Sequence, residues 1–293
     1  MILITGATGH TGQFLLDEMF AGSGNEYKVR CFVRKDSRNL DKLRNYNVEL
    51  VYGDIQDEEA FKKALTDVRT VIHIVNIKYS PMVMRISQEM GVEKIIFIHT
   101  TGMYSKYRAY AQEYKRIEEE IIAKCSTNYV ILRPTMIYGT TLDHNMHKLI
   151  NYIANHRVFP VFGRGNGLMQ PVHARDLAKA IVHSLNNPLA VKKAYNISGG
   201  SVLSYRQILN LIAKRVNPNI RFIYLPYGLS ILMGVIYNTA LRIIGRKPAI
   251  SIEQIRRLNE NKSYSHEDAA RDLGYAPVTF EQGIEEEIKS MGY

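Results

Sequence analysis

Cysteine and tryptophan are scarce in this 293-residue chain, which has two cysteines, Cys31 and Cys125, and no tryptophan. Two cysteines cannot build a disulfide framework or a zinc cluster, and we expect no metal site. They suit a reducing compartment, where we expect both to be small buried hydrophobic residues. Internal repeats and low-complexity linkers are also missing. The chain is nevertheless long enough to bury a core without staples.

A leader peptide and a membrane-spanning segment are not visible either. The chain opens with 1–5 (MILIT), which is typical of a strand and carries no basic leader. The most apolar window, Leu229 to Gly245, is interrupted by Asn238, Thr239 and Arg242 and is short for a bilayer span. We interpret it as a core or lid helix, with a helix on a membrane surface as the alternative. We therefore expect a cytoplasmic protein.

Acidic residues are sparse in one long stretch. Residues 141–257 hold 16 lysines and arginines against three acids, a charge of +13, whereas residues 1–140 carry +2 and residues 258–293 carry −5. Such a field attracts anions such as a nucleotide, a phosphorylated sugar, nucleic acid or an acidic membrane. The alternative is a solvated basic face. No helix-turn-helix or aromatic–basic motif accompanies the charge, so we expect no nucleic-acid partner.

Short apolar runs alternate with amphipathic stretches in the first half of the chain. The runs typical of strands are 2–5, 28–33, 48–52, 71–75, 94–99 and 130–133, and the stretches typical of helices are 12–21, 58–65, 81–90 and 107–124. This rhythm predicts an α/β fold with a doubly wound parallel sheet.

The rhythm weakens after Gly139. A strand at 194–197 and helices at 146–155, 176–185 and 205–216 are still expected, the last of them capped by Ser204. We predict a dinucleotide-binding domain over residues 1–140. Residues 141–293 should form mostly a smaller mixed C-terminal lobe that binds substrate, with some segments returning to the first domain.

A glycine-rich turn joins the first strand to the first helix, with Gly6, Gly9 and Gly12 spaced GxxGxxG. Gly6 permits a tight turn, Gly9 lets the backbone approach a pyrophosphate, and Gly12 lets helix and strand pack closely. The helix N-terminus adds N–H donors and a positive dipole end. The residues expected to bind a dinucleotide cofactor here are Gly6, Thr8, Gly9, His10, Thr11 and Gly12.

The end of the second strand bears on the choice of cofactor. Sites for NAD usually place an acid there, but this strand ends in Val33-Arg34-Lys35. A guanidinium suits the ribose 2′-phosphate, so Arg34 favours NADP(H) over NAD(H). Asp54, after the third strand, is expected to accept a hydrogen bond from the adenine amino group. Its alternative role is to cap the next helix.

Further motifs follow along the chain. They include Gly53-Asp54 after the third strand, 99–102 (HTTG) after the fifth, 133–139 (RPTMIYG), 171–176 (PVHARD) and 269–277 (AARDLGYAP). Together with the glycine turn, their order resembles the extended or atypical branch of the short-chain dehydrogenase/reductase superfamily. That branch includes nucleotide-sugar epimerases, dehydratases and NAD(P)H-binding relatives. The resemblance implies a Rossmann fold, a nicotinamide lying near Pro134 and Ile137, and a possible homodimer through the helix at 107–124.

The same resemblance implies a catalytic Ser/Thr, Tyr and Lys, with the tyrosine four residues before the lysine. Lys115, followed by Glu119, resembles the family's lysine and implies a ligand for the nicotinamide ribose; the alternative is a surface lysine paired with Glu119. Position 111 is alanine, and Tyr110 lies one residue too early, about 100° around a helix. Tyr110 remains a candidate acid/base if the helix begins near it. Thr100 and Thr101 either orient a substrate or only end the strand.

On the substrate side, the resemblance points to Asn145, Arg157 and Arg164 as contacts for a diphosphate. Met169-Gln170 stands where the family's sugar-nucleotide enzymes often carry arginine, as in atypical members. We expect His173 to be structural and Asp176 to cap the following helix. These residues predict an NAD(P)-linked reductase, epimerase or dehydratase for a small anionic or sugar-type substrate. The alternative is a non-catalytic NADPH-binding sensor or assembly protein, favoured by Ala111.

Overall fold

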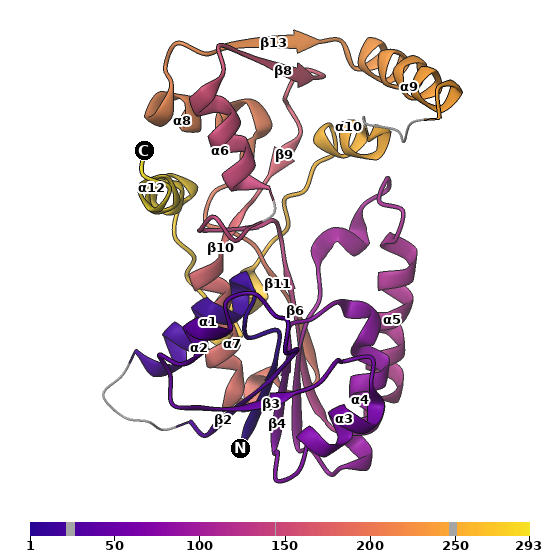
Figure 1. Cartoon of the computed structure of the whole chain (residues 1–293), viewed down its shortest axis with the longest axis vertical. Helices are drawn as coiled ribbons and strands as arrows, with labels where there is room; N and C mark the ends of the chain where they lie inside the picture. Colours follow the sequence, from indigo (N-terminus) through magenta and orange to yellow (C-terminus); the bar gives the residue numbers. More distant parts are fainter. Residues whose placement is uncertain (22–26, 144, 246–250) are drawn as a thin grey trace.

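The computed structural model describes residues 1–21, 27–143, 145–245 and 251–293. Its centre is a seven-stranded parallel sheet, in the order β11-β6-β5-β4-β1-β2-β3 (Figure 1). The strands are β1 (Ile2–Thr5), β2 (Val29–Val33), β3 (Val48–Tyr52), β4 (Thr70–His73), β5 (Lys94–Ile98), β6 (Asn128–Pro134) and β11 (Lys193–Ile197). The strand order reverses between β1 and β4, which places a crevice at their carboxyl ends. The predicted doubly wound sheet is confirmed.

Helices cover both faces of the sheet. One face packs against α1 (His10–Phe20), α7 (Ala174–Leu185) and α11 (Glu267–Leu273), and the other against α3 (Glu58–Ala64), α4 (Ser80–Glu89) and α5 (Ala111–Lys124). Consecutive strand residues alternate between the two cores: Leu3 packs on the α3–α5 side and Ile4 on the α1–α7 side. Cys31 and Cys125 are free and buried, one in each core, as expected.

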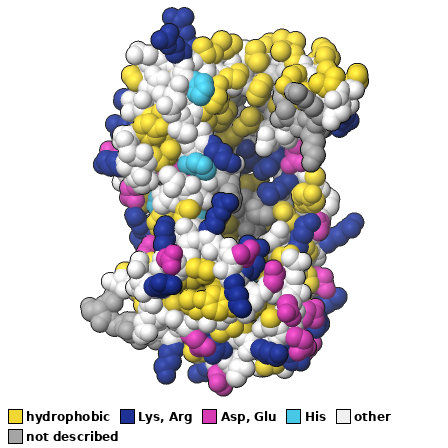
Figure 2. All heavy atoms as spheres, viewed as in Figure 1, with side chains coloured by type: hydrophobic (Ala, Val, Ile, Leu, Met, Phe, Trp, Pro, Cys, Tyr) yellow, Lys and Arg dark blue, Asp and Glu magenta, His cyan; other side chains and the backbone are white. Residues whose placement is uncertain are grey.

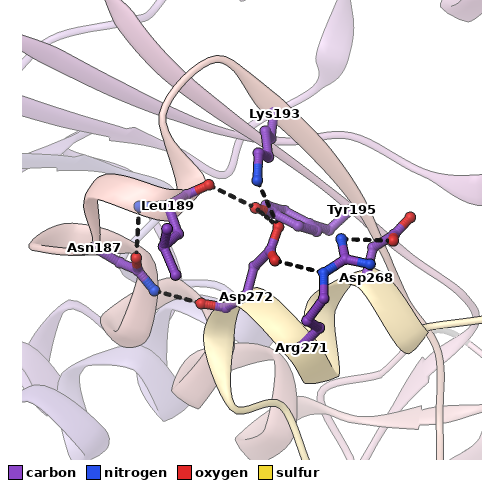
Figure 3. A network of polar contacts seen from close by, with 7 residues as sticks. All are labelled: Asn187, Leu189, Lys193, Tyr195, Asp268, Arg271 and Asp272. Atoms are coloured by element: carbon purple, nitrogen blue, oxygen red, sulfur yellow. Dashed lines mark hydrogen bonds and ion pairs between the residues drawn. The ribbon is translucent and has the colours of Figure 1, made fainter.

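The last strand of the sheet is fastened by a segment from near the end of the chain. Asp272 in α11 accepts hydrogen bonds from Lys193 Nζ at 2.8 Å and from the Tyr195 hydroxyl at 2.9 Å, both on β11, and from Arg271 Nε at 2.9 Å (Figure 3). These donors, Arg271 first, hold the pKa of Asp272 far below its usual range. The 269–277 motif therefore ties the C-terminal region back onto the sheet.

A smaller lobe lies beyond the carboxyl ends of the strands (Figure 1). Its core joins α6, α8, α12 and the strand β8. Its elements are β7 (Ile137–Tyr138), α6 (Met146–Asn155), β8 (Val158–Phe162), β9 (Leu168–Met169), β10 (Val172–His173), β12 (Leu203–Ser204), α8 (Tyr205–Val216), β13 (Arg221–Leu225), α9 (Tyr227–Ile243), α10 (Ile252–Leu258) and α12 (Phe280–Ser290). Ser204 caps α8 as predicted, in a capping box with Gln207. The short elements α2 (Leu40–Leu43), η1 (Ile77–Tyr79), η2 (Thr101–Tyr104) and η3 (Pro188–Ala190) complete the chain.

Neither Asp54, for which a cap was the alternative role, nor Asp176, for which it was the expected role, caps a helix. The cap of α3 is Asp57, which accepts from the Ala60 N–H, while the Asp54 carboxylate closes a turn by accepting from the Gln56 N–H. The cap of α7 is the His173 ring, which accepts from the Arg175 N–H. Asp176 lies inside that helix and instead accepts from the Val278 N–H at 3.0 Å. In each helix a neighbouring side chain, Asp57 in one and His173 in the other, accepts the N–H group at the helix start instead.

Two helix predictions also need correction. The helix expected from residue 107 begins four residues later, at Ala111, because Ser105 Oγ accepts the N–H groups of Tyr107 and Arg108 and holds a turn there. The apolar window at 229–245 does not form a core helix. It forms α9, a largely exposed helix of which only Ser230 and Gly234 are buried. Among the described residues, no helix is both long and apolar enough to cross a membrane.

Candidate functional site

The glycine turn between β1 and α1 has a backbone that excludes side chains. Gly6 has a φ of +79°, and a Cβ on Gly12 would lie 2.6 Å from Ala7 Cα and closer still to the Gly6 carbonyl oxygen. Gly9 precedes α1, so the first N–H groups of the helix point out of the turn without a capping side chain. A pyrophosphate fits such a cradle, since it accepts backbone N–H bonds and needs close approach.

The other residues of the turn make contacts within the protein. The Thr8 carbonyl accepts a hydrogen bond from the Gln13 side-chain amide at 3.1 Å, and Thr11 is buried. The His10 ring packs edge-on against Phe14, 5.5 Å between centroids, and Phe14 packs in the same way on His173. His173 is itself buried, as expected for a structural residue.

Arg34 and Asp54 follow neighbouring strands, since Val33 of β2 pairs with Tyr52 of β3. Arg34 is exposed, and its Nε lies 3.6 Å from the Asp36 carboxylate, an open contact that a phosphate can replace. The two side chains therefore stand at the mouth of the same crevice. This placement is compatible with an adenosine 2′-phosphate near Arg34.

The segment after β5 carries two of the predicted residues, Thr100 and Thr101. Thr100 Oγ1 accepts the Gly102 N–H at 3.0 Å and so starts η2. Thr101 is buried and donates to the Pro134 carbonyl at 3.2 Å, which joins this segment to the 133–139 loop. Ile137, in that loop, is partly buried in β7. Both threonines thus have structural bonds besides any role toward a ligand.

Tyr110 is the residue immediately before α5, with a non-helical ψ of 9° and an exposed ring. The 100° displacement expected for a helical position therefore does not apply to it. Lys78 Nζ sits 4.6 Å from the ring centroid. Tyr110 is free to reach a ligand, and a cation stands beside it.

Lys115 and Tyr114 lie on different faces of α5. The Lys115 side chain is 56% exposed, and its ammonium lies 3.9 Å from the Glu119 carboxylate. Tyr114, which the sequence analysis passed over, is buried, with its ring 6.4 Å from that of Tyr110. Residues three or four apart share a helix face, so Ala111, Tyr114 and Glu118 form the inward stripe, while Tyr110 lies exposed just before the helix. Lys115 must turn away from Glu119 to reach a cofactor.

A buried charged network supports this stripe. Glu118 accepts from His99 Nδ1 at 2.9 Å and from Arg133 Nε at 2.8 Å, and His99 Nε2 lies 3.3 Å from Ser80 Oγ. Burial raises the pKa of Glu118, but the bonds from His99 and Arg133 outweigh it and leave that pKa below its usual value. Burial lowers the pKa of His99. The network locks α5 to the ends of β5 and β6.

The segment 251–266 forms a roof over the η2 loop, and α10 lies directly above that loop in Figure 1. Glu260 accepts from Ser105 Oγ at 2.6 Å and from the Lys106 N–H at 2.7 Å. The ring of Tyr264 packs on Tyr104 at 5.2 Å. Residues about 150 positions apart in the chain therefore close one side of the site.

Three cationic side chains, Arg108, Arg257 and Lys262, lie close together under this roof. No sequence motif predicted this cluster. The Arg108 guanidinium lies so close to Gly102 that a Cβ there would overlap it. Burial, followed by the charge of Arg108, lowers the pKa of Arg257, whose buried Nε lacks a hydrogen-bond partner among the described residues. Burial and Arg257 lower the pKa of Lys262 to about 8. Figure 2 shows lysine and arginine side chains around a hollow between the two halves of the molecule.

The predicted substrate residues do not all come together. Arg157 and Arg164 stand beyond opposite ends of β8, a five-residue strand that spans roughly 16 Å. Arg164 lines a cavity of about 820 Å³ with Asn166, Tyr227, Asn259 and others. Asn145 precedes α6 and leaves its side chain exposed, because Asp143 accepts the N–H groups at that helix start.

Gln170 occupies the place where an arginine was expected in sugar-nucleotide enzymes. Its side chain donates to the Gly199 carbonyl at 2.8 Å and accepts the Tyr264 N–H at 2.9 Å. It therefore holds the roof segment in place. The clustered cations Arg108, Arg257 and Lys262 come from the roof segment and from the stretch between η2 and α5 instead.

Comparison with known proteins fits this geometry. The sequence model of the NmrA-like family matches residues 1–288. The chain belongs to the NmrA-like family. This NmrA-like protein is 22% identical to the N-acetyl-alpha-D-glucosaminyl-diphospho-ditrans,octacis-undecaprenol 4-epimerase of Escherichia coli O157:H7, over 98% of this chain and 94% of the relative.

Two further similarities place the NmrA-like protein among related folds. It is 22% identical to the rat mitochondrial NADH dehydrogenase [ubiquinone] 1 alpha subcomplex subunit 9, over 95% of this chain and 77% of that one. Its structure superposes on the UDP-glucose 4-epimerase of Thermotoga maritima with a TM-score of 0.75, at 17% identity, covering 99% and 98% of the two chains. The protein has the dinucleotide-binding fold of the extended epimerases and dehydratases.

Proposed function

We propose that this NmrA-like protein binds NADP(H) and reduces or epimerises a sugar that carries a diphosphate. The observation that carries the proposal is the cluster of Arg108, Arg257 and Lys262 beside the η2 loop. Cations that are half-buried and incompletely paired favour a multiply charged anion. Both epimerases named above act on sugars attached to a diphosphate, which supports this substrate class.

Each residue has a proposed task. The turn with Gly6, Gly9 and Gly12 would hold the cofactor's pyrophosphate, and Arg34 its 2′-phosphate, with Asp54 beside the adenine. Bound NADP(H) supplies hydride transfer. Tyr110 would move the proton at the reacting hydroxyl or carbonyl, oriented by Thr100 or Thr101, while Lys115 would turn to the ribose near Pro134 and Ile137. Asn145 and Arg164 would contact the substrate from the lobe.

Titration with NADPH and NADH, followed by cofactor fluorescence, tests the cofactor assignment. The chain has no tryptophan, so the protein background is tyrosine alone. We expect NADPH to bind at least about tenfold more tightly than NADH, and Arg34→Ala to remove that preference, as one charged contact is worth about that much. Arg44→Ala, which changes another exposed arginine, is the control. Equal binding of both cofactors by the unmodified protein would overturn the NADP(H) preference.

A second candidate function is a sensor or assembly protein that binds NADPH without turnover. The solvent-facing Lys115 and the alanine at position 111 favour it, and the rat relative is named as a subunit of a larger enzyme. Incubation with UDP-sugars and with polyprenyl-diphosphate sugars, followed by chromatographic separation of epimers, discriminates the two. Conversion of any of these sugars supports the enzyme. NADPH binding without conversion, together with cofactor-dependent binding of a partner, supports the sensor.

A further inference from the structure

The helix α9 exposes apolar side chains on nearly its whole circumference. It contacts the rest of the protein through a narrow stripe that includes the buried Ser230 and Gly234. We use the name α9 patch for the exposed residues Tyr227, Leu229, Leu232, Met233, Val235, Ile236, Tyr237, Ile243 and Ile244. A contiguous apolar surface of this kind marks an interaction site.

The α9 patch continues onto the two-stranded sheet that precedes it. Val158 of β8 and Ile223 of β13 are also exposed, and β13 leads directly into α9. Figure 1 places β8, β13 and α9 along one end of the molecule, at the outer end of the lobe, and Figure 2 shows apolar side chains over the upper right of that end. The exposed apolar residues of β8, β13 and α9 therefore lie at one end of the molecule, where a flat surface can contact them together.

The three elements along this edge of the molecule, β8, β13 and α9, contain no aspartate or glutamate. Exposed arginines lie at both ends of the edge: Arg157 and Arg221 at the start of β8 and β13, and Arg242 in the last turn of α9. Glu253 belongs to α10, which packs against α9, and lies 3.8 Å from Arg257. An apolar edge with arginines at its ends complements an anionic lipid headgroup layer.

The length of α9 decides between lying on a bilayer and crossing it. Its 17 residues would extend about 25 Å, short of the roughly 30 Å hydrocarbon core. We propose that α9 lies in the interface of an anionic membrane and docks the lobe on it. The proposal does not depend on the proposed reaction, because docking requires neither cofactor nor substrate.

Flotation of the full-length protein with lipid vesicles tests the docking. We expect binding to phosphatidylcholine–phosphatidylglycerol vesicles that weakens with salt, and little binding to phosphatidylcholine alone. Leu232→Glu with Ile236→Glu changes side chains that are 55% and 59% exposed, so the fold should be kept. That variant should lower vesicle partitioning at least about tenfold. Ile122→Glu with Leu189→Glu, at 49% and 59% exposure on the sheet domain, is the matched control and should bind like the unmodified protein.

A fluorescent reporter gives an independent readout. Because the chain lacks tryptophan, Ile236→Trp introduces a single indole, whose emission should shift to the blue on anionic vesicles. Ile122→Trp should show no shift. The docking is refuted if the unmodified protein stays in the aqueous fraction, or if the Leu232/Ile236 variant floats as well as the control. A dimer in lipid-free buffer that the same variant converts to monomer, without vesicle binding, would also refute it and make α9 a contact between two copies.

Discussion

The proposed cofactor and substrate ends of the site differ in the groups that a ligand would contact: backbone atoms at the first and side chains at the second. At the proposed cofactor end, residues 6–12 offer backbone groups to the ligand. Steric crowding around Gly6 and Gly12 requires that neither position carries a side chain. At the proposed substrate end, the η2 loop, the start of α5 and the roof at 251–266 contribute side chains from distant parts of the chain. A backbone cradle tolerates little change, whereas a site made of side chains can be refitted residue by residue.

The largest effect is expected from breaking the cofactor end. Gly12→Val places a branched side chain against the backbone of Gly6 and Ala7. We expect a loss of stability of about 3 kcal/mol or more, or complete loss of cofactor binding, because backbone atoms cannot move aside cheaply. Thermal unfolding and NADPH titration measure the two effects. Gly228→Ala, where a Cβ meets nothing within 4 Å, is the control, and equal behaviour of the two variants would contradict the steric argument.

At the substrate end, Tyr110→Phe separates chemistry from binding. If the protein turns over a sugar, we expect the rate to fall about 10²-fold, as for loss of a positioned acid/base, with NADPH affinity unchanged. Tyr107→Phe, an equally accessible tyrosine in the same loop, should leave the rate unaltered. A rate for Tyr110→Phe within about twofold of the unmodified enzyme would remove this tyrosine from the mechanism.

Lys115→Ala asks whether α5 also contributes to the cofactor end. If Lys115 binds the ribose, its removal should lower turnover at least about tenfold and weaken NADPH binding. Lys124→Ala changes a lysine on the same helix with a similar pairing to Glu120 and should do neither. Identical kinetics for both variants would make Lys115 a surface lysine.

The pH dependence of anion binding sharpens the contrast further. Lys262 has a pKa of about 8, so it is charged below that pH and neutral above it. UDP, used as a diphosphate probe, should bind several-fold more weakly as the pH rises from about 7 to 9, while NADPH affinity changes less. Lys262→Met should flatten the UDP profile. An unchanged profile in that variant would place the diphosphate elsewhere.

The last prediction concerns the pH dependence of stability, at the buried Glu287 of α12. Glu287 is buried, accepts the Gly139 N–H at 2.9 Å, and its pKa is raised to about 9 by burial and by its hydrogen bond with Asp143. The folded state thus keeps a proton that the unfolded chain releases near pH 4.5. Stability from this group is complete below that pH and is lost as the pH rises through 9, by at most about 1.4 kcal/mol per pH unit. Chemical denaturation of Glu287→Gln should show a flatter profile between these values, and a slope equal to that of the unmodified protein would contradict the assignment.

Much of the sheet domain was predictable because its signals are local. Alternating apolar runs gave the strands, and the glycine spacing gave the turn, within a few residues of the observed bounds. The caps of α3 and α7 were mispredicted because Asp57 and His173 compete with Asp54 and Asp176 over a few residues. Such choices depend on backbone geometry that residue type alone does not specify.

The roof was not predictable for a different reason. Arg108, Arg257 and Lys262 have no common motif, and long-range contacts such as the bonds of Glu260 to Ser105 and Lys106 bring their segments together. The exposure of α9 was also not predictable from the sequence, because the composition of an apolar segment does not show whether other elements bury it. Its sequence suggested a core helix, and its surroundings in the fold left it exposed.

The sequence by itself determined the parallel sheet, the dinucleotide turn and the charge of the second half, since each follows from residue order over a few positions or from a sum of charges. Tertiary structure alone decided which cations face the cleft, which side of α5 turns inward, and that α9 has no cover. Those outcomes depend on packing between segments more than 100 residues apart, where the free energy of many contacts, rather than local preference, sets the arrangement.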